Sequence, residues 1–201
     1  MPGDRPVNVL IVGVGGQGII LAGKVLAGAA RLAGFDVKTS EVHGMAQRGG
    51  SVVTHVRFGR RVYSPLIPEG EVDCLIAFER LEALRWVNSL RPGGILIVND
   101  YAIPPITTLS GREPYPGGIL EELEARSPNM VTVRAFELAR AAGSARSVNI
   151  VLLGVASRFL GVEKSCWLDA LGESIPSRFM DVNLRAFMSG AGLTLTTRRS
   201  S

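Results

Sequence analysis

Cysteine, aromatic residues and long hydrophobic runs are all scarce in this sequence of 201 residues. The two cysteines, Cys74 and Cys166, lie far apart and form neither a metal-binding spacing nor a disulfide framework, which favours a reducing cytoplasm. No run of about 18 residues is apolar without glycine or charge, so we expect no membrane span. The first residues, MPGDRPVNVL, do not resemble a secretory signal. We therefore expect a cytoplasmic protein without membrane association.

The excess of basic residues is too small and too scattered along the chain to indicate nucleic-acid binding. Lysine and arginine outnumber aspartate and glutamate by 22 to 18, a net charge of +4, and aromatic residues that could stack on bases make up 6%. Part of the excess lies in residues 194–201, which we expect to be a disordered tail. We expect no nucleic acid among the partners.

The remaining residues, 1–193, predict a single α/β domain. Hydrophobic residues make up 46% of the chain, enough for a substantial core. Short apolar runs alternate with segments of helical periodicity, which is typical of a Rossmann-like, mostly parallel sheet with helices on both faces. The C-terminal region is predicted to be helical, with Asp181 as an N-cap. Strands are expected at 7–12, 36–40, 51–58, 61–64, 72–78, 95–99 and 131–135, and the pair 51–58 and 61–64 is expected to form one antiparallel hairpin.

The segment 19–33 predicts a helix that is apolar nearly all round. Only Lys24 and Arg31 are charged between Gly18 and Gly34, and they share one narrow stripe. Such a helix is buried on more than one side. Either it lies between its own sheet and a neighbouring helix, or part of its surface contacts another subunit.

A glycine loop follows the first predicted strand. Gly13, Gly15 and Gly18 match G-x-G-x-x-G between a strand and a helix, where backbone N–H groups can hold a phosphate or another anion. Glu41 lies 23 residues beyond Gly18, near the spacing of the ribose-binding acid in dinucleotide enzymes. The same glycines also suit a tight turn with no ligand, so the motif alone does not identify one.

Four longer segments of the sequence indicate a particular protein family. GVGGQGIILAGKVLA, SEVHGMAQRGGSVVTHVRFG, YSPLIPEGEVDCLIAFE and VNIVLLG together resemble the gamma-type domain of 2-oxoacid:ferredoxin oxidoreductases, over roughly 8–193. The second segment, in a short separate chain, is most similar to the beta subunits of the indolepyruvate-specific members of that family. The resemblance implies a Rossmann-like subunit of a heteromeric complex.

The resemblance also implies a reaction that this chain does not perform alone. Such complexes oxidatively decarboxylate an arylpyruvate with coenzyme A and pass electrons to ferredoxin. Thiamine diphosphate, Mg and the [4Fe–4S] clusters are expected in a larger alpha subunit. The present sequence has no cysteine set for a cluster and no G-D-G segment with a following asparagine for a magnesium-diphosphate site. We expect no catalytic residue and no metal site in this chain.

The family implies that the glycine loop contributes to the coenzyme A site, and the loop after the second strand is expected at the same carboxyl end of the sheet, where ligands bind. The glycine loop would offer backbone N–H groups to a phosphate or to the pantetheine chain, or it would lean against the partner subunit without a ligand. Arg48, in the loop after the second strand, suits a carboxylate or phosphate, or an ion pair across the subunit interface. The candidate binding residues are Gly13, Gly15, Gly16, Gln17, Gly18, His43, Gln47, Arg48, Gly49 and Gly50.

The two histidines and Asn149 have separate expected roles. His43 is expected to contact substrate or the interface, and His55, on the alternating strand, to be structural. Asn149, within VNIVLLG, is expected to cap or bridge to the glycine loop. Two rival functions remain open: a non-catalytic scaffold subunit without a ligand, and a stand-alone nicotinamide- or flavin-binding enzyme supported by Glu41.

Overall fold

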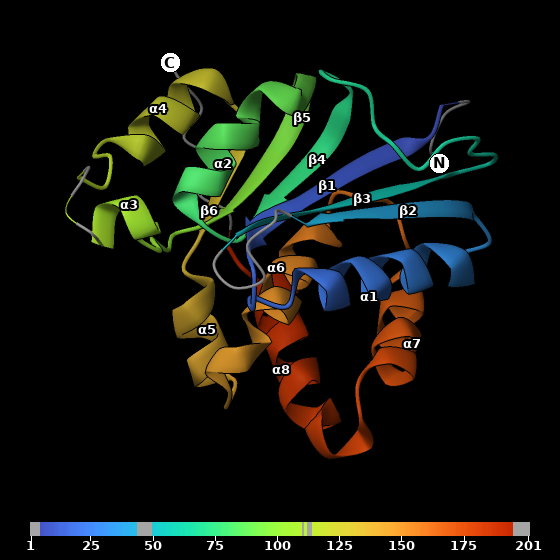
Figure 1. Cartoon of the computed structure of the whole chain (residues 1–201). Coiled ribbons are helices and arrows are strands. Elements are labelled where there is room, and N and C mark those ends of the chain that lie inside the picture. Colours follow the sequence, from blue (N-terminus) through green and yellow to red (C-terminus); the bar gives the residue numbers. More distant parts are fainter. Residues whose placement is uncertain (1–4, 44–49, 110, 112–113, 195–201) are drawn as a thin grey trace.

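A six-stranded sheet between two layers of helices forms the body of the molecule (Figure 1). The computed structural model describes residues 5–43, 50–109, 111 and 114–194. Residues 195–201 of the expected tail, 194–201, and residues 44–49 after the second strand lie outside these ranges. The strands are β1 (Val7–Val14), β2 (Asp36–His43), β3 (Ser51–Gly59), β4 (Val72–Ala77), β5 (Leu90–Asn99) and β6 (Met130–Val133).

The strand order is β2-β3-β1-β4-β5-β6. β1 pairs in parallel with β4, β4 with β5, and β5 with β6, whereas β3 runs antiparallel to both of its neighbours, β1 and β2. Five strands therefore share one direction and one strand opposes them. This confirms the expected mostly parallel α/β sheet.

The hairpin predicted between 51–58 and 61–64 is wrong. Both edges of β3 are already paired, one with β1 and the other with β2, so the segment after Gly59 has no strand to join. It is held instead by side chains. The N–H of Val62 donates to Asp36 Oδ2 at 2.8 Å, and Arg57 donates to the carbonyl oxygens of Ser64 and Leu66.

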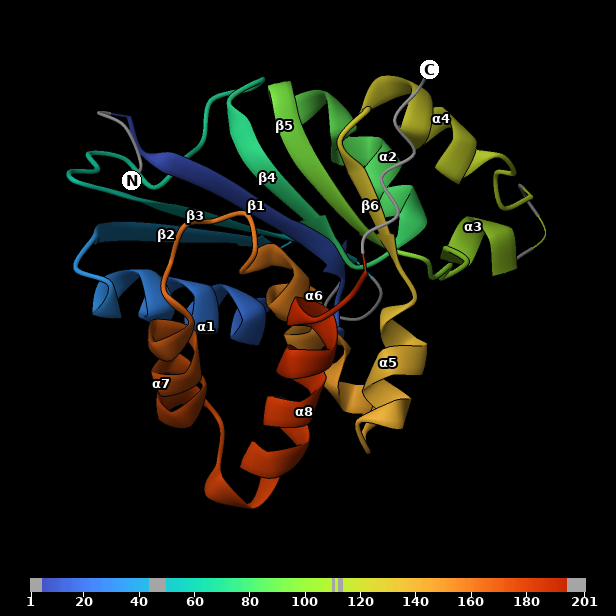
Figure 2. The same ribbon diagram turned by 180° about the vertical axis from the view of Figure 1, so that it is seen from behind.

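Helices cover the two faces of the sheet unequally (Figures 1 and 2). One face carries α1, α5, α6, α7 and α8, and the other carries α2 and α4. This larger layer confirms the helical C-terminal region. The helices are α1 (Ile19–Leu32), α2 (Arg80–Trp86), α3 (Ile106–Leu109), α4 (Ile119–Arg126), α5 (Ala135–Ala141), α6 (Val148–Ala156), α7 (Lys164–Ser174) and α8 (Met180–Ala191).

Two local predictions fail for identifiable reasons. Asp181 is not an N-cap: a short 3-10 turn, Ser177–Phe179, precedes α8, so Phe179 is the capping position and Asp181 lies within the first turn. The strand expected at 95–99 begins earlier, at Leu90, because Leu90 already pairs with Val72 and Ile95 pairs with Cys74. Because three residues of β4, 72–74, lie opposite six residues of β5, 90–95, the extra residues of β5 bulge out of the ladder.

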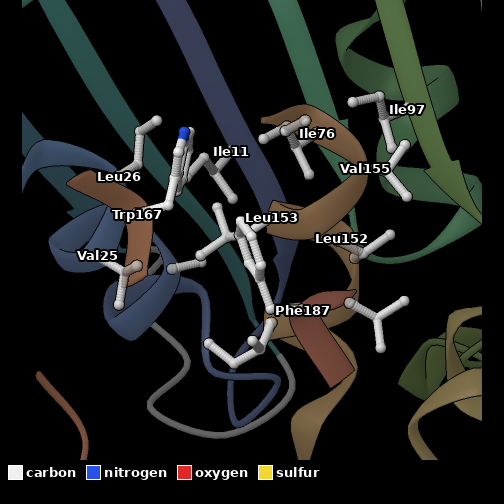
Figure 3. Close-up of a cluster of buried hydrophobic side chains, with 14 of the residues drawn as sticks. Ile11, Val25, Leu26, Ile76, Ile97, Leu152, Leu153, Val155, Trp167 and Phe187 are labelled. Atoms are coloured by element: carbon white, nitrogen blue, oxygen red, sulfur yellow. The ribbon is translucent and has the colours of Figure 1, made fainter. Parts of the chain in front are cut away.

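Alternate residues of the central strands form two separate cores. Val9 and Ile11 of β1 face the larger helical layer, and Leu10 and Val12 face α2 and α4. Figure 3 shows the first core, where Ile11, Ile76 and Ile97 from three adjacent strands pack against α6 and the rings of Trp167 and Phe187. Burying each such side chain stabilises the fold by about 1.5–3 kcal/mol. Both faces of the sheet are therefore needed for stability.

α6 and α8 touch backbone to backbone. A Cβ atom added to Gly154 would lie 2.1 Å from the carbonyl oxygen of Phe187, and one added to Gly190 would lie 2.0 Å from that of Val151. No side chain fits at either position. The two glycines thus set the separation of α6 and α8, and α6 is buried from Asn149 to Ala156.

α1 lies between the sheet and α7, as one of the two interpretations of its apolar character expects. A Cβ on Gly23 would lie 2.6 Å from Thr54 Cγ2 of β3, and one on Gly28 would lie 3.3 Å from Ala170 Cβ of α7. The outer side of the helix keeps Ile20 46% exposed. Across the part of the chain that the structure describes, no helix has the length and apolar character needed to cross a membrane.

Candidate functional site

The carboxyl ends of β1 and β4 meet where the sheet changes winding direction. From β1 the chain passes into α1 on one face, and from β4 it passes into α2 on the opposite face (Figure 1). Such a switch point opens a crevice at the carboxyl edge, which is where ligands bind in open α/β sheets. The glycine loop lies at this position.

The glycine loop owes its shape to two different constraints. Gly16 and Gly18 adopt positive φ angles of 97° and 80°, which favour glycine. Gly13 is needed for space, because a Cβ there would lie 2.6 Å from Gln17 Oε1 and 2.8 Å from Phe78 Cβ. No side chain crowds Gly16, where an added Cβ would meet no atom within 4 Å. The backbone at Gly16 is therefore open to contact from outside the loop.

The side chain of Gln17 bridges the ends of β1 and β4 at the switch point. Its Oε1 accepts the N–H of Val14 at 2.7 Å, and its Nε2 donates to the carbonyl oxygen of Phe78 at 3.1 Å. The amide thus joins the loop after β1 to the end of β4. The hydrogen bonds of Gln17 go to the protein backbone, and the contacts open to a ligand come from the neighbouring glycines.

The structure brings Gly50 against the glycine loop. The N–H of Gly15 donates to the Gly50 carbonyl oxygen at 3.0 Å, and Ser51 pairs with Val14 at the start of β3. His43 closes β2 opposite Val52, and its side chain is outside the described part. Gln47, Arg48 and Gly49 also lie outside the described residues, so their assigned roles stay predictions.

Asn149 confirms the expected bridge to the glycine loop. It lies at the start of α6, 3% exposed, and its Nδ2 donates to the Gly18 carbonyl oxygen at 3.3 Å. Its Oδ1 accepts the N–H of Ile150. The C-terminal helical layer is therefore attached directly to the loop.

Buried acids at the start of α2 hold the surrounding loops, and the sequence analysis missed them. Glu79, 1% exposed, accepts the N–H of Ile103 at 3.1 Å and the hydroxyl of Tyr115 at 2.5 Å, and it caps α2 through the N–H of Glu82. Burial, together with this bond to Glu79, raises the pKa of Tyr115. Glu82 accepts the hydroxyl of Ser51 at 2.5 Å. Their signal in the sequence is their place directly after an apolar strand.

A cavity of about 450 Å³ opens beside the glycine loop. It is walled by the loop, by the ends of β5 and α6, and by the aromatic side chains of Tyr101 and Phe136. Arg146 is the one charged side chain among the described residues that line it. The lining residues are Gly16, Gln17, Gly18, Leu21, Asn99, Tyr101, Phe136, Ala145, Arg146, Val148 and Asn149.

Glu41 does not reach this cavity. It pairs with Thr54 of β3, which in turn pairs with Ile11 of β1, so a whole strand separates it from β1, at two strand spacings or roughly 10 Å. In dinucleotide-binding folds the second strand is the neighbour of the first, whereas here β3 lies between β1 and β2. Glu41 lines a separate groove of about 500 Å³ between α1 and β2. The stand-alone nicotinamide hypothesis thereby loses its supporting residue.

Neither metal chemistry nor a catalytic triad can be built from what is described of this edge. Among the described residues, no group of three or more histidine, cysteine, aspartate or glutamate side chains could hold a metal ion. His55 is half-buried on β3 and accepts the N–H of Ile67 at Nδ1, a structural role. The groups that the site does offer are backbone amides, one guanidinium, carboxamides and two aromatic rings.

A Rossmann-like α/β domain with a glycine loop at its switch point is the class that this fold and site define. The chain belongs to the pyruvate ferredoxin/flavodoxin oxidoreductase family, which matches residues 8–193. It is 40% identical over 190 residues to indolepyruvate oxidoreductase subunit IorB of Thermococcus kodakarensis, across 91% of this chain and 93% of that protein. The subunit IorB of Methanothermobacter thermautotrophicus is 41% identical over 189 residues, across 92% and 96% of the two chains.

Two solved structures share the fold. The gamma subunit of a keto/oxoacid ferredoxin oxidoreductase from Geobacter sulfurreducens PCA has a TM-score of 0.72 at 24% identity, covering 92% of this chain and 94% of that chain. The 2-oxoglutarate:ferredoxin oxidoreductase from Magnetococcus marinus, with 2-oxoglutarate, coenzyme A and succinyl-CoA bound, has a TM-score of 0.72 at 21% identity. It covers 98% of this chain and 33% of that chain. At these identities the likeness establishes the fold alone.

Proposed function

We propose that this chain is the accessory subunit of a thiamine-dependent indolepyruvate or arylpyruvate:ferredoxin oxidoreductase of the cytoplasm. The observation that carries the proposal is the end-to-end match to subunit IorB, at 40% identity over more than nine-tenths of both chains. A match that covers nearly the whole of both chains supports the same place in a complex. The reaction is the oxidative decarboxylation of a 2-oxoacid with coenzyme A.

The redox and thiamine chemistry belongs to a larger alpha subunit in this proposal. The present chain has two cysteines, and a [4Fe–4S] cluster takes four thiolates. Cys74 is buried, and burial raises the pKa of its thiol to about 12, so it is protonated and a poor ligand. In this proposal the partner binds the clusters, thiamine diphosphate and Mg, and ferredoxin accepts the electrons from the complex.

The proposed contribution of this chain is part of the coenzyme A site. The bare backbone at Gly16, the turn at Gly18 and the Arg146 guanidinium border one cavity, and this set suits the phosphate groups of coenzyme A. Gly50 is hydrogen-bonded to the same loop, and Arg48 is included in the proposed site on the family resemblance. Gln17 supports the loop from within.

Reconstitution tests the proposal. The chain is mixed with its thiamine-binding partner, and reduction of ferredoxin or a viologen dye is followed with indolepyruvate and coenzyme A. We expect activity in the assembled pair and none from either chain alone. Activity from this chain alone, or none from an assembled pair with several 2-oxoacids, would refute it. Assembly with undiminished activity after Arg146→Gln and Arg48→Ala would favour the scaffold alternative.

A further inference from the structure

Two aromatic side chains form a shelf at the mouth of the cavity beside the glycine loop. Tyr101 follows β5 and Phe136 lies in the first turn of α5. Their ring centroids are 6.0 Å apart, with the planes inclined by 21°. They remain 41% and 39% exposed. Exposed stacked rings facing a cavity offer a flat surface to another ring.

The shelf is held in place by the backbone on both of its sides. The Tyr101 carbonyl oxygen accepts the N–H of Arg80, and the Tyr101 N–H donates to Asn99. Two residues on, Ile103 is anchored to buried Glu79. On the other side, the N–H of Ala135 donates to the side chain of Asn99. Because Asn99 contacts both segments, the two rings keep their spacing before any ligand arrives.

The charge of the cavity has one sign. Arg146 is its one charged lining residue among those described, and the open backbone at Gly16 faces the same space. The groove beside α1 is a useful contrast, because its lining includes both Lys24 and Arg31 and the acids Glu41 and Glu173. A cation, a bare backbone and a ring shelf together suit a ligand that is both flat and negatively charged.

We infer that this cavity binds an organic anion with an aromatic ring, the ring lying on Tyr101 and Phe136 and the negative charge at Arg146 and the glycine loop. This deepens the proposed function, on which it rests for the identity of the site. Two sources share the chemistry: the adenosine phosphate end of coenzyme A, and the arylpyruvate or its aryl carboxylate product. A volume of about 450 Å³ lies within the usual range of pockets that bind small organic ligands.

Calorimetric titration of the full chain separates the sources. The probes are adenosine 3′,5′-bisphosphate, indole-3-acetate as an unreactive aryl carboxylate, and inorganic pyrophosphate as an anion without a ring. We expect one ring-bearing probe to bind at least fivefold more tightly than pyrophosphate, and the better probe identifies the source. Equal binding of all three, or no binding in either the full chain or the reconstituted complex, would overturn the inference.

Variants test each half of the recognition. Tyr101→Leu should weaken the ring-bearing probe by about fivefold or more and leave pyrophosphate unchanged. Arg146→Gln should weaken all anions about tenfold and flatten their salt dependence. The matched controls are Tyr63→Leu and Arg61→Gln. These two side chains contact each other at the surface, outside the cavity, so both variants should bind all three probes normally. Equal losses in the controls, or no loss in Tyr101→Leu, would refute the shelf.

The ring-binding inference and the proposed function can be refuted separately. A reconstituted pair that reduces ferredoxin while Tyr101→Leu binds normally would refute the shelf alone. Probe binding that depends on Tyr101 and Arg146, in a chain that never supports ferredoxin reduction, would refute the subunit assignment alone.

Discussion

The Nδ2 of Asn149 donates to the carbonyl oxygen of Gly18 across 131 residues of sequence. Asn149 begins the buried helix α6, and Gly18 is the residue from which α1 starts, at a φ of 80°. The two helices that flank the cavity are thus joined by one hydrogen bond at their N-termini. A Cβ on Gly18 would lie 2.7 Å from that Nδ2, so the contact leaves no room for another residue there.

Asn149→Ala should lower the free energy of unfolding by about 1–2 kcal/mol, because it removes a buried hydrogen bond and opens a small gap. It should also raise the KM for coenzyme A in the complex by loosening the glycine loop. Urea unfolding and steady-state kinetics measure the two effects. Asn183→Ala is the control, since Asn183 Nδ2 makes the same kind of bond to the Phe179 carbonyl oxygen at the surface. A loss as large in the control would contradict the special role of Asn149.

Alanine at either glycine of the α6–α8 contact should be strongly destabilising. Gly154→Ala and Gly190→Ala each place a Cβ about 2 Å from a backbone oxygen, which forces the helices apart at a cost of about 3 kcal/mol or more. Gly172→Ala in α7 meets open space and should stabilise the chain by about 0.5–1 kcal/mol. Thermal unfolding of the three variants provides the comparison. Similar melting temperatures for all three would show that α6 and α8 do not touch as described.

His55 should make stability pH-dependent below neutrality. Burial, and then the nearby charge of Arg57, lowers the pKa of His55 below its ordinary value of 6.5. The unfolded chain therefore binds the proton first, so stability is complete above about pH 6.5 and falls as the pH drops below that value. The slope is at most about 1.4 kcal/mol per pH unit, and smaller for this partly exposed ring.

Urea unfolding between pH 5.5 and 7.5 checks the effect of His55. His55→Asn keeps an acceptor for the Ile67 N–H and cannot titrate, so the profile should flatten relative to the parent chain. His43 is present in both proteins and cancels in the difference. Parallel profiles would show that His55 does not titrate differently on folding.

Removing the buried carboxylate of Glu79 should loosen the segments around Ile103 and Tyr115. Glu79→Ala leaves the N–H groups of Glu82 and Ile103 and the Tyr115 hydroxyl without their hydrogen-bond acceptor. The free energy of unfolding should fall by about 3 kcal/mol. Amide hydrogen exchange at Ile103 should accelerate well before global unfolding. Glu124→Ala, on the exposed side of α4, should change stability by less than about 0.5 kcal/mol. Unchanged exchange at Ile103 in Glu79→Ala would show that the loop is held elsewhere.

The sequence predicted those parts of the fold that depend on local pattern. The apolar run of β1, the glycine turn after it and the alternation of β3 are each encoded within a few residues, and all three were placed correctly. Val52 and Val56 face one core and Val53 the other, as the period of two requires.

Predictions that depended on which strands become neighbours fared less well. The order β2-β3-β1 places β3 where a dinucleotide fold has β2, and this one insertion both moved Glu41 away from the glycine loop and used the edge that the expected hairpin required. Spacing along the chain contains no information on strand order. The acids of α2 and the Tyr101–Phe136 shelf were missed for a related reason, since their partners lie 20 or more residues away.

The close approach of α6 and α8 at Gly154 and Gly190 bears on how the glycine loop is supported. Because backbone meets backbone at both positions, no side chain there can repack, and we expect the two helices to keep their separation. Asn149 lies at the start of α6 and holds Gly18, while α8 keeps Met188 on its outer surface. A partner that displaced α8 would therefore act on the glycine loop through α6 and the hydrogen bond from Asn149 to Gly18.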